Sequence, residues 1–438
     1  MLLIYTHTIT PRVEYIFSVF FRGIFFLNYR LTSEEAVYKN YQGTKFSYGN
    51  HPLEINDTFW QADTLLFEKE IKNFRPDVKI KDDNIFLIPT ENPHSQQPFD
   101  PFAAAFYLIS RYEEYLPYTP DRFNRFEADQ SLMGQHHILH RPLVNEWASQ
   151  VVYILQNRFP DFHFTQPSFS SNITIDIDQA YAYKHKGMIR NAGTFVKYLL
   201  KGKTKQCLLQ VKTLAGGSPD PFDSFPFLQE TEEKRGIPII YFVNLGKYSA
   251  FDRNLMPHHP ALHKLLKKLA ETNSVGIHPS YYANDRPELF AKETILLSAI
   301  LDMPITKSRQ HYLRLKFPDT YHHLIKNGIT EDYSLGYATM PGFRAGTCTP
   351  FYWFDLMEDK STHLKIYPTI FMEVTFLEDL NMQPLQAFEE MKKLIDTVKN
   401  YKGHLIFIWH NTTASDSWHG RKEWKDIFSK VVDYLAEG

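Results

Sequence analysis

Apolar and polar positions alternate from Asn172 to Asp178, in the run Asn-Ile-Thr-Ile-Asp-Ile-Asp, and this pattern predicts a buried β-strand. Successive side chains of a strand point to opposite faces, so Asp176 and Asp178 share one face near the C-terminal end of the strand. Two carboxylates in that place could serve as a metal ligand and a general base. Asp at a strand end is more commonly an N-cap or a solvated turn residue, so the downstream sequence has to decide.

Strand-like and helix-like runs alternate from Asn172 to the end of the chain. We expect strands at 237–243, 274–277, 364–374 and 404–409, and helices around 260–271, 288–301 and 385–401. This alternation predicts a parallel α/β architecture, closed or partly closed, in which the working residues lie at the C-terminal ends of the strands. Polar residues gather at those ends, because His278 follows one strand and His410 follows the last.

The first part of the chain mixes strand and helix patterns. We expect a short strand and an amphipathic helix at the N-terminus, a strand over 84–89, and helices over 100–115 and from 142 to about 159. Asp100 is placed to cap the first of these two later helices, with Pro101 in its first turn. The segment 165–171 is rich in Ser, Thr, Gln and Pro and predicts a connector. Two domains follow, a smaller mixed α/β domain over residues 1–165 and a larger α/β domain over 170–438.

Composition excludes several classes of protein. A chain of 438 residues is long enough for two domains with a substantial core. The net charge of -2 gives no indication of a basic patch for nucleic acid or for an anionic membrane. Cys207 and Cys348, the two cysteines, provide neither a disulfide framework nor a Cys-x-x-Cys zinc site.

The apolar stretches at the N-terminus are too interrupted to be a signal peptide. Arg12, Glu14 and Arg22 break the run, and no later segment supplies the ~18 uninterrupted apolar residues of a membrane span. We therefore expect a soluble, cytoplasmic protein with no membrane span and no nucleic-acid partner. The oligomeric state does not follow from the sequence.

Four motifs accompany the alternating strands and helices. They are Thr174-Ile-Asp-Ile-Asp178, Gly276-Ile-His-Pro-Ser-Tyr-Tyr282, Gly342-Phe-Arg-Ala-Gly346 and Ile408-Trp-His-Asn411. In this order they resemble the motifs of the polysaccharide deacetylase, or NodB-like, family of carbohydrate esterases, over about residues 170–438. The resemblance implies a distorted (β/α) barrel that holds one divalent metal ion, often zinc. The chain also resembles a subgroup in which such a barrel follows an N-terminal domain of unknown function.

The resemblance also implies a role for each motif. Asp176 would be the base, Asp178 and His278 metal ligands, Arg344 the residue that orients and tunes Asp176, and His410 the catalytic acid. The two acids are separated by Ile177, where the family has them adjacent, although both still face the same way. The second histidine of the second motif is missing, because Tyr282 stands in its place. A phenol with a pKa of ~10 is a poor zinc ligand at neutral pH.

A replacement ligand is available in the segment Ser308-Arg-Gln-His-Tyr-Leu-Arg314. His311 lies about thirty residues beyond His278, past an expected helix, where the next strand should begin. Asp178, His278 and His311 would supply one oxygen and two nitrogens and leave a position open for water or substrate. Taken singly, either histidine is more often a hydrogen-bonded core residue than a ligand.

The function that the resemblance implies is metal-dependent hydrolysis of an acetyl group on an amino sugar or polysaccharide precursor, N- or O-linked, in cell-envelope or exported-polysaccharide synthesis. The metal would activate water, Asp176 would take its proton and His410 would protonate the leaving group. Tyr281, Tyr282 and Trp409 are candidates to contact the carbohydrate, with core packing as the alternative for Tyr281 and Trp409.

Two alternatives stay open. The missing histidine of the second motif favours a barrel that has lost catalysis and binds carbohydrate or a protein partner. Glu373, near the end of its strand, is either an acid behind the site or a partner of Asp176 or Asp178 in a glycosidase-like carboxylate pair.

Overall fold

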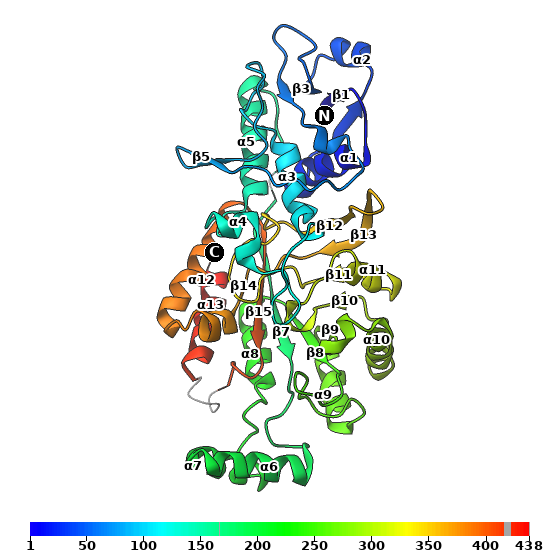
Figure 1. Cartoon of the computed structure of the whole chain (residues 1–438). Coiled ribbons are helices and arrows are strands. Elements are labelled where there is room, and N and C mark those ends of the chain that lie inside the picture. The colour runs from blue at the N-terminus through cyan, green and yellow to red at the C-terminus, as the bar shows by residue number, and fades with distance from the viewer. Residues whose placement is uncertain (166, 416–421, 438) are drawn as a thin grey trace.

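The chain is organised around two β-sheets. In the computed structural model, which describes residues 1–165, 167–415 and 422–437, a four-stranded sheet lies in the N-terminal part and a nine-stranded sheet in the remainder. Figure 1 shows the N-terminal part at one end of the molecule and helices α6 and α7 at the other, with the larger sheet between them. Residue 166, within the expected connector, lies outside the described residues.

The N-terminal sheet is parallel and has the order β2-β1-β3-β4. The strands of this part are β1 (Leu2–Thr6), β2 (Tyr29–Thr32), β3 (Lys45–Gly49) and β4 (Phe59–Gln61), with a separate hairpin of β5 (Lys79–Lys81) and β6 (Asn84–Phe86). Its helices are α1 (Pro11–Phe17), the π-helical η1 (Ser18–Ile24), α2 (Glu35–Asn40), α3 (Pro101–Ile109), α4 (Leu132–Gln135) and α5 (Leu143–Arg158), with 3-10 turns at Thr64–Leu66, Tyr112–Tyr115 and Ala128–Gln130.

The predicted cap of α3 is confirmed, but the helix is shorter than expected. The Asp100 carboxylate accepts hydrogen bonds from the amides of Phe102 and Ala103. The helix ends at Ile109 because Arg111 adopts a left-handed conformation with φ of 56°, which a right-handed helix does not accommodate. A 3-10 turn replaces its expected last turn.

Parallel pairing dominates the nine-stranded sheet, whose order is β12-β13-β11-β10-β9-β8-β7-β15-β14 with only the β12–β13 pair antiparallel. The strands are β7 (Ser170–Ile177), β8 (Ile239–Asn244), β9 (Ser274–His278), β10 (Lys307–Ser308), β11 (Glu331–Asp332), β12 (Phe351–Asp355), β13 (Lys360–Ile366), β14 (Phe371–Met372) and β15 (His404–His410). The helices are α6 (Gly187–Leu200), α7 (Thr204–Leu214), α8 (Phe225–Arg235), α9 (Pro260–Ala270), α10 (Pro287–Leu301), α11 (Asp319–Lys326), α12 (Pro384–Asn400) and α13 (Lys422–Ala436), with short turns at Tyr281–Asn284, His311–Leu313 and Thr375–Asp379.

The expected strand over 364–374 is divided into β13 and β14. Pro368 lies in the gap, and a proline has no N–H to donate to a ladder. The linking residues still bond to both neighbours, because the Tyr367 amide donates to Asp332 O and the Ile370 amide to Ile406 O. The strand pairing therefore defines a predominantly parallel α/β sheet whose two ends are bridged by this short link.

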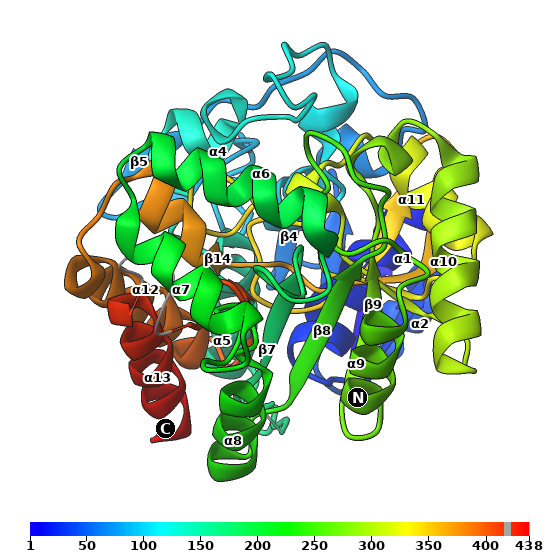
Figure 2. The same cartoon turned by 90° about the horizontal axis from the view of Figure 1, so that it is seen from below.

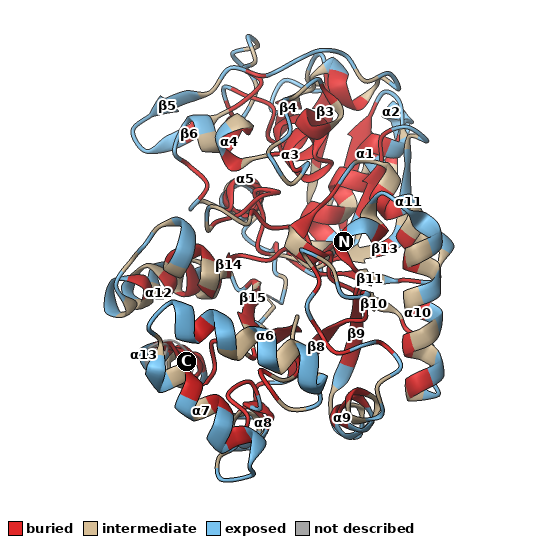
Figure 3. Cartoon of the chain, turned by 60° about the horizontal axis from the view of Figure 1, so that its bottom comes forward, coloured by how far each residue is buried: buried red, intermediate tan, exposed pale blue. Residues whose placement is uncertain are grey.

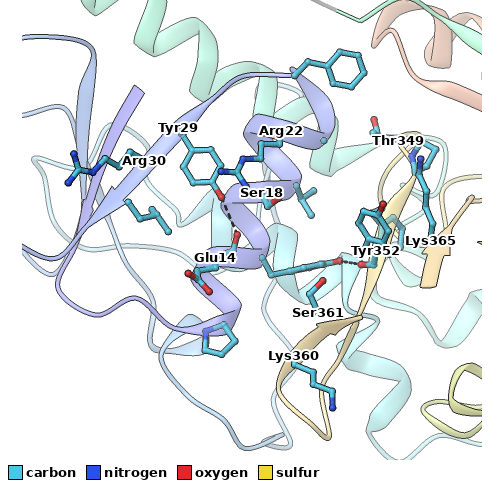
Figure 4. A pocket seen from close by; sticks show the side chains of 18 residues that line it. Glu14, Ser18, Arg22, Tyr29, Arg30, Thr349, Tyr352, Lys360, Ser361 and Lys365 are labelled. Atoms are coloured by element: carbon cyan, nitrogen blue, oxygen red, sulfur yellow. Dashed lines mark hydrogen bonds between the residues drawn. The ribbon is translucent and has the colours of Figure 1, made fainter. Parts of the chain in front are cut away.

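The buried apolar residues form a core that crosses from the N-terminal part into the second part. Tyr15 and Phe106 each pack against Phe354, with ring centroids 5.0 and 5.1 Å apart, and all three belong to one buried cluster. A cavity of about 1000 Å³ opens at the same junction, between η1 and the β12–β13 hairpin (Figure 4). None of the predicted site residues lines it.

Helices α6 and α7 were not predicted from the sequence. Figure 1 shows them beyond the end of β7, Figure 2 shows them from below, in front of the sheet, and Figure 3 shows their outer surfaces largely exposed. Among the described residues, no helix combines the length and apolar character needed to cross a membrane.

Candidate metal centre and catalytic site

The predicted site residues come from neighbouring strands of the larger sheet. Asp176 on β7 is opposite His410 on β15 in the parallel register, and Asn244 on β8 is opposite His278 on β9. Asp178 follows β7 by one residue, and His311 follows the end of β10 rather than beginning a strand. The C-terminal ends of parallel strands meet at one edge of a sheet, so these side chains lie together.

Asp178, His278 and His311 form the group that can hold a metal ion. One ligand atom from each lies within 4.8 Å of the others, the only such group found among the described residues. Asp178 Oδ1 is 3.2 Å from His278 Nε2 and 3.6 Å from His311 Nε2. Both histidines are buried, so the group is enclosed by the protein on that side.

Each histidine is held at its other ring nitrogen. His278 Nδ1 is 2.5 Å from the carbonyl oxygen of Arg309, and His311 Nδ1 is 3.0 Å from Asp252 Oδ1. A carbonyl oxygen and a carboxylate both accept, so these contacts place a hydrogen on Nδ1 and turn Nε2 toward Asp178, where a cation that displaces the Nε2 proton would be bound. Metal-binding histidines are usually oriented in this way by a partner behind them.

The charges of the group favour a cation. Burial opposes ionisation of Asp178, but the charge of His311 and the nearby ring of His278 hold its pKa well below the usual range. Burial likewise disfavours the charged form of His311, yet Asp178 and Asp252 raise its pKa to about 9. The two carboxylates that attract a proton to His311 would also attract a divalent ion.

The donor set fits such an ion. Asp178 Oδ1 is buried and has no hydrogen-bond partner, which is costly unless another ligand satisfies it. Ligand atoms around a tetrahedral zinc ion at ~2.0–2.2 Å are separated by roughly 3.4 Å, close to the distances from Asp178 Oδ1 to the two histidines. Two imidazole nitrogens and one carboxylate oxygen are ligands that zinc accepts, with one position left open.

Asp176 lies beside this group, and its partner is Arg309. Asp176 Oδ2 is 3.7 Å from His278 Nε2, and Asp176 Oδ1 is 3.6 Å from Arg309 Nη1. Both Asp176 Oδ1 and Arg309 Nη1 are buried without a hydrogen bond. Arg309 therefore supports two site residues, Asp176 through its charge and His278 through its carbonyl oxygen.

The prediction that Arg344 orients Asp176 needs correction. The Arg344 guanidinium donates to both carboxylate oxygens of Glu114, at 3.0 and 2.6 Å, and to the carbonyl of Gly336. These bonds direct it toward the N-terminal part, because Glu114 belongs to that part. The third motif thus lies at a junction within the chain, and Arg309 takes the place beside the carboxylate.

His410 is oriented by Glu373. The Glu373 Oε1 atom is 2.8 Å from His410 Nδ1 and also accepts from the His410 amide and the Thr413 hydroxyl. Burial opposes the charged imidazolium, but the Glu373 carboxylate outweighs it and raises the pKa of His410 to about 10, with smaller effects of Asp178 and Asp176. His410 Nε2 points toward Asp178 Oδ2, 3.7 Å away. Of the two roles left open for Glu373, its contacts match the acid behind the site.

Two of the three aromatic residues expected to contact sugar are packing residues instead. Trp409 is completely buried, with its ring 5.3 Å from that of Phe428. Tyr281 stacks on Phe251 at 3.9 Å, and the Arg314 guanidinium lies over its ring. A strand interior and a covered ring leave no free face for a sugar.

Tyr282 keeps an exposed ring, 40% accessible, outside the metal-binding group. It lines a cavity of about 560 Å³ together with Tyr248 and Arg286. Asp252, which holds His311, lines the same cavity. This cavity therefore adjoins the site directly.

The sequence prediction missed Arg309, Asp252 and Tyr312. Arg309 and Tyr312 lie in the segment that supplied His311, so a closer reading of that segment could have found them. Asp252 lies 59 residues from His311 along the chain, and no local pattern indicates their contact. The Tyr312 ring is 4.5 Å from that of His311. The N-terminal part reaches this point, because Phe123 packs on Tyr312 at 5.0 Å.

Comparison with known proteins adds a partial family match. A family model described as a family of unknown function (DUF7033) matches residues 2–160, the N-terminal part. No curated protein matches the chain.

Three solved structures are similar to part of the chain. A putative polysaccharide deacetylase from Mycobacterium smegmatis is 13% identical with a TM-score of 0.40, covering 62% of this chain and 84% of that one. A mutant of a CE4 family pseudoenzyme with restored enzymatic activity is 10% identical with a TM-score of 0.30, covering 61% and 63%. A 4-alpha-glucanotransferase from Thermococcus litoralis is 11% identical with a TM-score of 0.34, covering 62% and 38%. Similarity at this level does not bear on function.

Proposed function

We propose that the chain is a metal-dependent hydrolase that removes acetyl groups, N- or O-linked, from an amino sugar or polysaccharide precursor. The observation that carries the proposal is the convergence of Asp178, His278 and His311 beside the Asp176–His410 pair. The order of the four sequence motifs supports it independently. The proposal includes a (β/α) barrel of the deacetylase type, closed through the link between β13 and β14.

The chemistry follows from the positions of the side chains. A divalent cation at Asp178, His278 and His311 would polarise the acetyl carbonyl and make water a better nucleophile. Asp176, buried and facing Arg309, would accept the proton of the attacking water. His410 enters protonated, because Glu373 raises its pKa to about 10, and would deliver its proton to the departing amine or alcohol.

The cavity beside the site supports a carbohydrate substrate. Its volume of about 560 Å³ is within the range of small-ligand sites, and it offers the phenol of Tyr282 and the guanidinium of Arg286. An aromatic face and a polar donor are the groups that a pyranose ring uses for stacking and hydrogen bonding. The acetyl group would then point toward Asp252 and the metal ligands.

Metal analysis followed by acetate release tests the proposal. The purified protein is stripped with chelator, reloaded with zinc, and assayed on acetylated amino sugars and nucleotide-linked acetylated precursors. We expect stoichiometric zinc and acetate release in the wild type, with both lost in His311→Ala and zinc retained in Tyr282→Phe as the matched control. Undiminished zinc in His311→Ala removes that residue from the ligand set.

The alternative, a barrel that binds carbohydrate without catalysis, makes a different prediction in the same experiment. It is favoured by the tyrosine at position 282, where the family has a histidine. Protein that takes up no zinc, or releases no acetate when loaded, yet binds glycans would support the alternative and exclude the hydrolase.

A further inference from the structure

Helices α6 and α7 form a hairpin that turns its apolar side chains outward. Met188 is 88% exposed, Ile189 90% and Leu200 82%, and Val196, Leu199, Leu208, Val211 and Leu214 are also exposed. Figure 3 shows these two helices with little protein against their outer faces. Exposed apolar surface of this extent on a folded chain marks a contact with something else.

The exposed residues are spaced as on one face of each helix. Ile189, Val196 and Leu200 on α6 recur at intervals of seven and four residues, and Leu208, Val211 and Leu214 on α7 at intervals of three. Residues at these intervals lie along one side of an α-helix. Each helix therefore carries a continuous apolar stripe toward solvent.

Polar groups occupy the inner side of the hairpin and donate hydrogen bonds to backbone carbonyls there. The Gln210 amide donates to the carbonyl of Asn191, the Thr213 hydroxyl to that of Pro219, and the Cys207 thiol to that of Phe195. A small apolar cluster of its own, including Tyr198 and Phe222, lies beneath. The inner side of the hairpin is already packed, so the apolar side chains of the stripes are left facing outward.

The charge around these stripes has one sign. From residue 179 to residue 219 the sequence contains no Asp or Glu. The basic residues in this interval are Lys184, Lys186, Arg190, Lys197, Lys201, Lys203, Lys205 and Lys212. The near-balanced charge of the whole chain conceals this interval, so the expectation that the chain has no basic patch is wrong here.

We propose that the α6–α7 hairpin docks the protein on a lipid bilayer that bears anionic headgroups. An apolar stripe flanked by lysines is the arrangement of helices that lie in a membrane interface, where the stripe enters the acyl boundary and the lysines meet the headgroups. Lys197, Lys201, Lys205 and Lys212 are exposed and available for that contact. A second copy of the hairpin is a poor occupant, because it would bring two wholly basic surfaces together.

The hairpin is fixed to the end of the sheet that carries the candidate site. Asp220 binds the amides of Ala182, Tyr183 and Lys184, which ties the entry of α6 to the exit of α7. Arg190 donates to the carbonyls of Arg253 and Asn254 in the body. Docking would therefore present the Asp178 end of the sheet to the bilayer. That orientation suits a substrate at the membrane surface. The location of the substrate rests on the proposed function, whereas the docking itself does not.

Vesicle co-sedimentation of the full chain tests the docking without any activity measurement. One set of vesicles is phosphatidylcholine alone and the other is an equimolar mixture with phosphatidylglycerol. We expect binding to the mixed vesicles that weakens as salt is raised, and at least tenfold weaker binding for Ile189→Glu/Leu200→Glu and for Lys201→Glu/Lys205→Glu.

Matched controls keep the result specific. Ile295→Glu/Leu385→Glu removes two exposed apolar residues elsewhere, and Lys264→Glu/Lys267→Glu reverses two exposed lysines on α9; both should bind as the wild type does. Circular dichroism establishes that the variants are folded. The proposal is overturned if the wild type does not bind the mixed vesicles, or if the controls lose as much binding as the hairpin variants. If the wild type does not bind vesicles and Ile189→Glu/Leu200→Glu abolishes self-association, the hairpin is a contact between copies of the chain instead.

Discussion

Replacing Arg344 by methionine should destabilise the fold and leave the candidate metal site intact. Arg344 belongs to a buried group of four charges with Arg111, Glu113 and Glu114, each side chain at most 2% exposed. The two positive and two negative charges balance. Methionine keeps much of the volume and removes the charge, so the group would hold one uncompensated negative charge.

The size of the effect follows from the contacts that are lost. Arg344 supplies two of the three side-chain hydrogen bonds that Glu114 accepts, and the third comes from Arg111 Nε at 2.8 Å. Removing one partner of a buried ion pair costs about 3–5 kcal/mol, because the remaining charge stays desolvated. That is a large fraction of the roughly 5–15 kcal/mol by which most proteins are stable.

A double-mutant cycle measures this coupling. Urea unfolding is followed by circular dichroism and tryptophan fluorescence for the wild type, Arg344→Met, Glu114→Met and the double variant, with coincident transitions as the condition for analysis. We expect the double variant to be more stable than Arg344→Met alone, because it restores neutrality around Arg111 and Glu113. Zinc content should be unchanged in all four proteins.

Substitution of Arg309 should have a different effect from substitution of Arg344. Arg309→Met removes the charge that faces Asp176, so it should lower acetate release by more than its effect on stability explains. If Arg344→Met lowers acetate release at a temperature where it is fully folded, or if the two substitutions at 344 and 114 are simply additive, the structural role of Arg344 is refuted.

Three further predictions concern single residues. Asp252→Asn should weaken zinc binding by about 10–100-fold in calorimetric titration, because it loosens His311; unchanged affinity would contradict that role. His410→Ala should lower kcat for acetate release by roughly 10²–10⁴-fold with zinc affinity nearly unchanged, whereas a parallel loss of zinc would make His410 a ligand. Burial, with Lys365, lowers the pKa of His404 to about 4, so the folded protein binds fewer protons than the unfolded chain between this value and the usual ~6.5 and loses stability as pH falls through that window. Urea unfolding at the two ends of this window measures the loss of stability, and His404→Asn should reduce that loss by about 1–2 kcal/mol after allowance for partial exposure. The same pH dependence in the wild type and the variant would exclude His404 as the cause.

The sequence predicted most strands of the larger sheet and the convergence of its polar ends. Strands at 237–243, 274–277 and 404–409 correspond to β8, β9 and β15, because continuous apolar runs mark strands buried on both faces. Because these strands are parallel, their C-terminal ends lie at one edge of the sheet. Asp178, His278 and His311 come together for this topological reason.

Side-chain direction was harder to predict than chain order. The third motif occupies the expected place in the sequence, but its glycines serve a close contact with the N-terminal part. Gly342 has a φ of 136°, and a Cβ there would collide with the carbonyl of Leu139. The backbone is thus turned so that Arg344 faces Glu114, a contact between residues 230 positions apart that no local pattern encodes.

The outward orientation of helices α6 and α7 could not be predicted, for a different reason. Their apolar periodicity is ordinary, and periodicity alone normally implies a buried face. Only the tertiary structure shows that these stripes face solvent and that polar residues such as Gln210 and Thr213 lie inside. Charge summed over the whole chain likewise concealed the absence of acids between 179 and 219.

The N-terminal part also contributes to the candidate site itself. Tyr312 and Leu313, which directly follow His311, have φ of 60° and 53°, a left-handed conformation that costs roughly 1–2 kcal/mol per non-glycine residue. Contacts from the N-terminal part hold this turn: Arg125 donates to the carbonyl of Tyr312, and the carbonyl of Phe123 accepts from Arg314. A strained turn persists only where its surroundings fix it. The position of His311 therefore depends on the N-terminal part, which makes that part a structural component of the candidate metal centre.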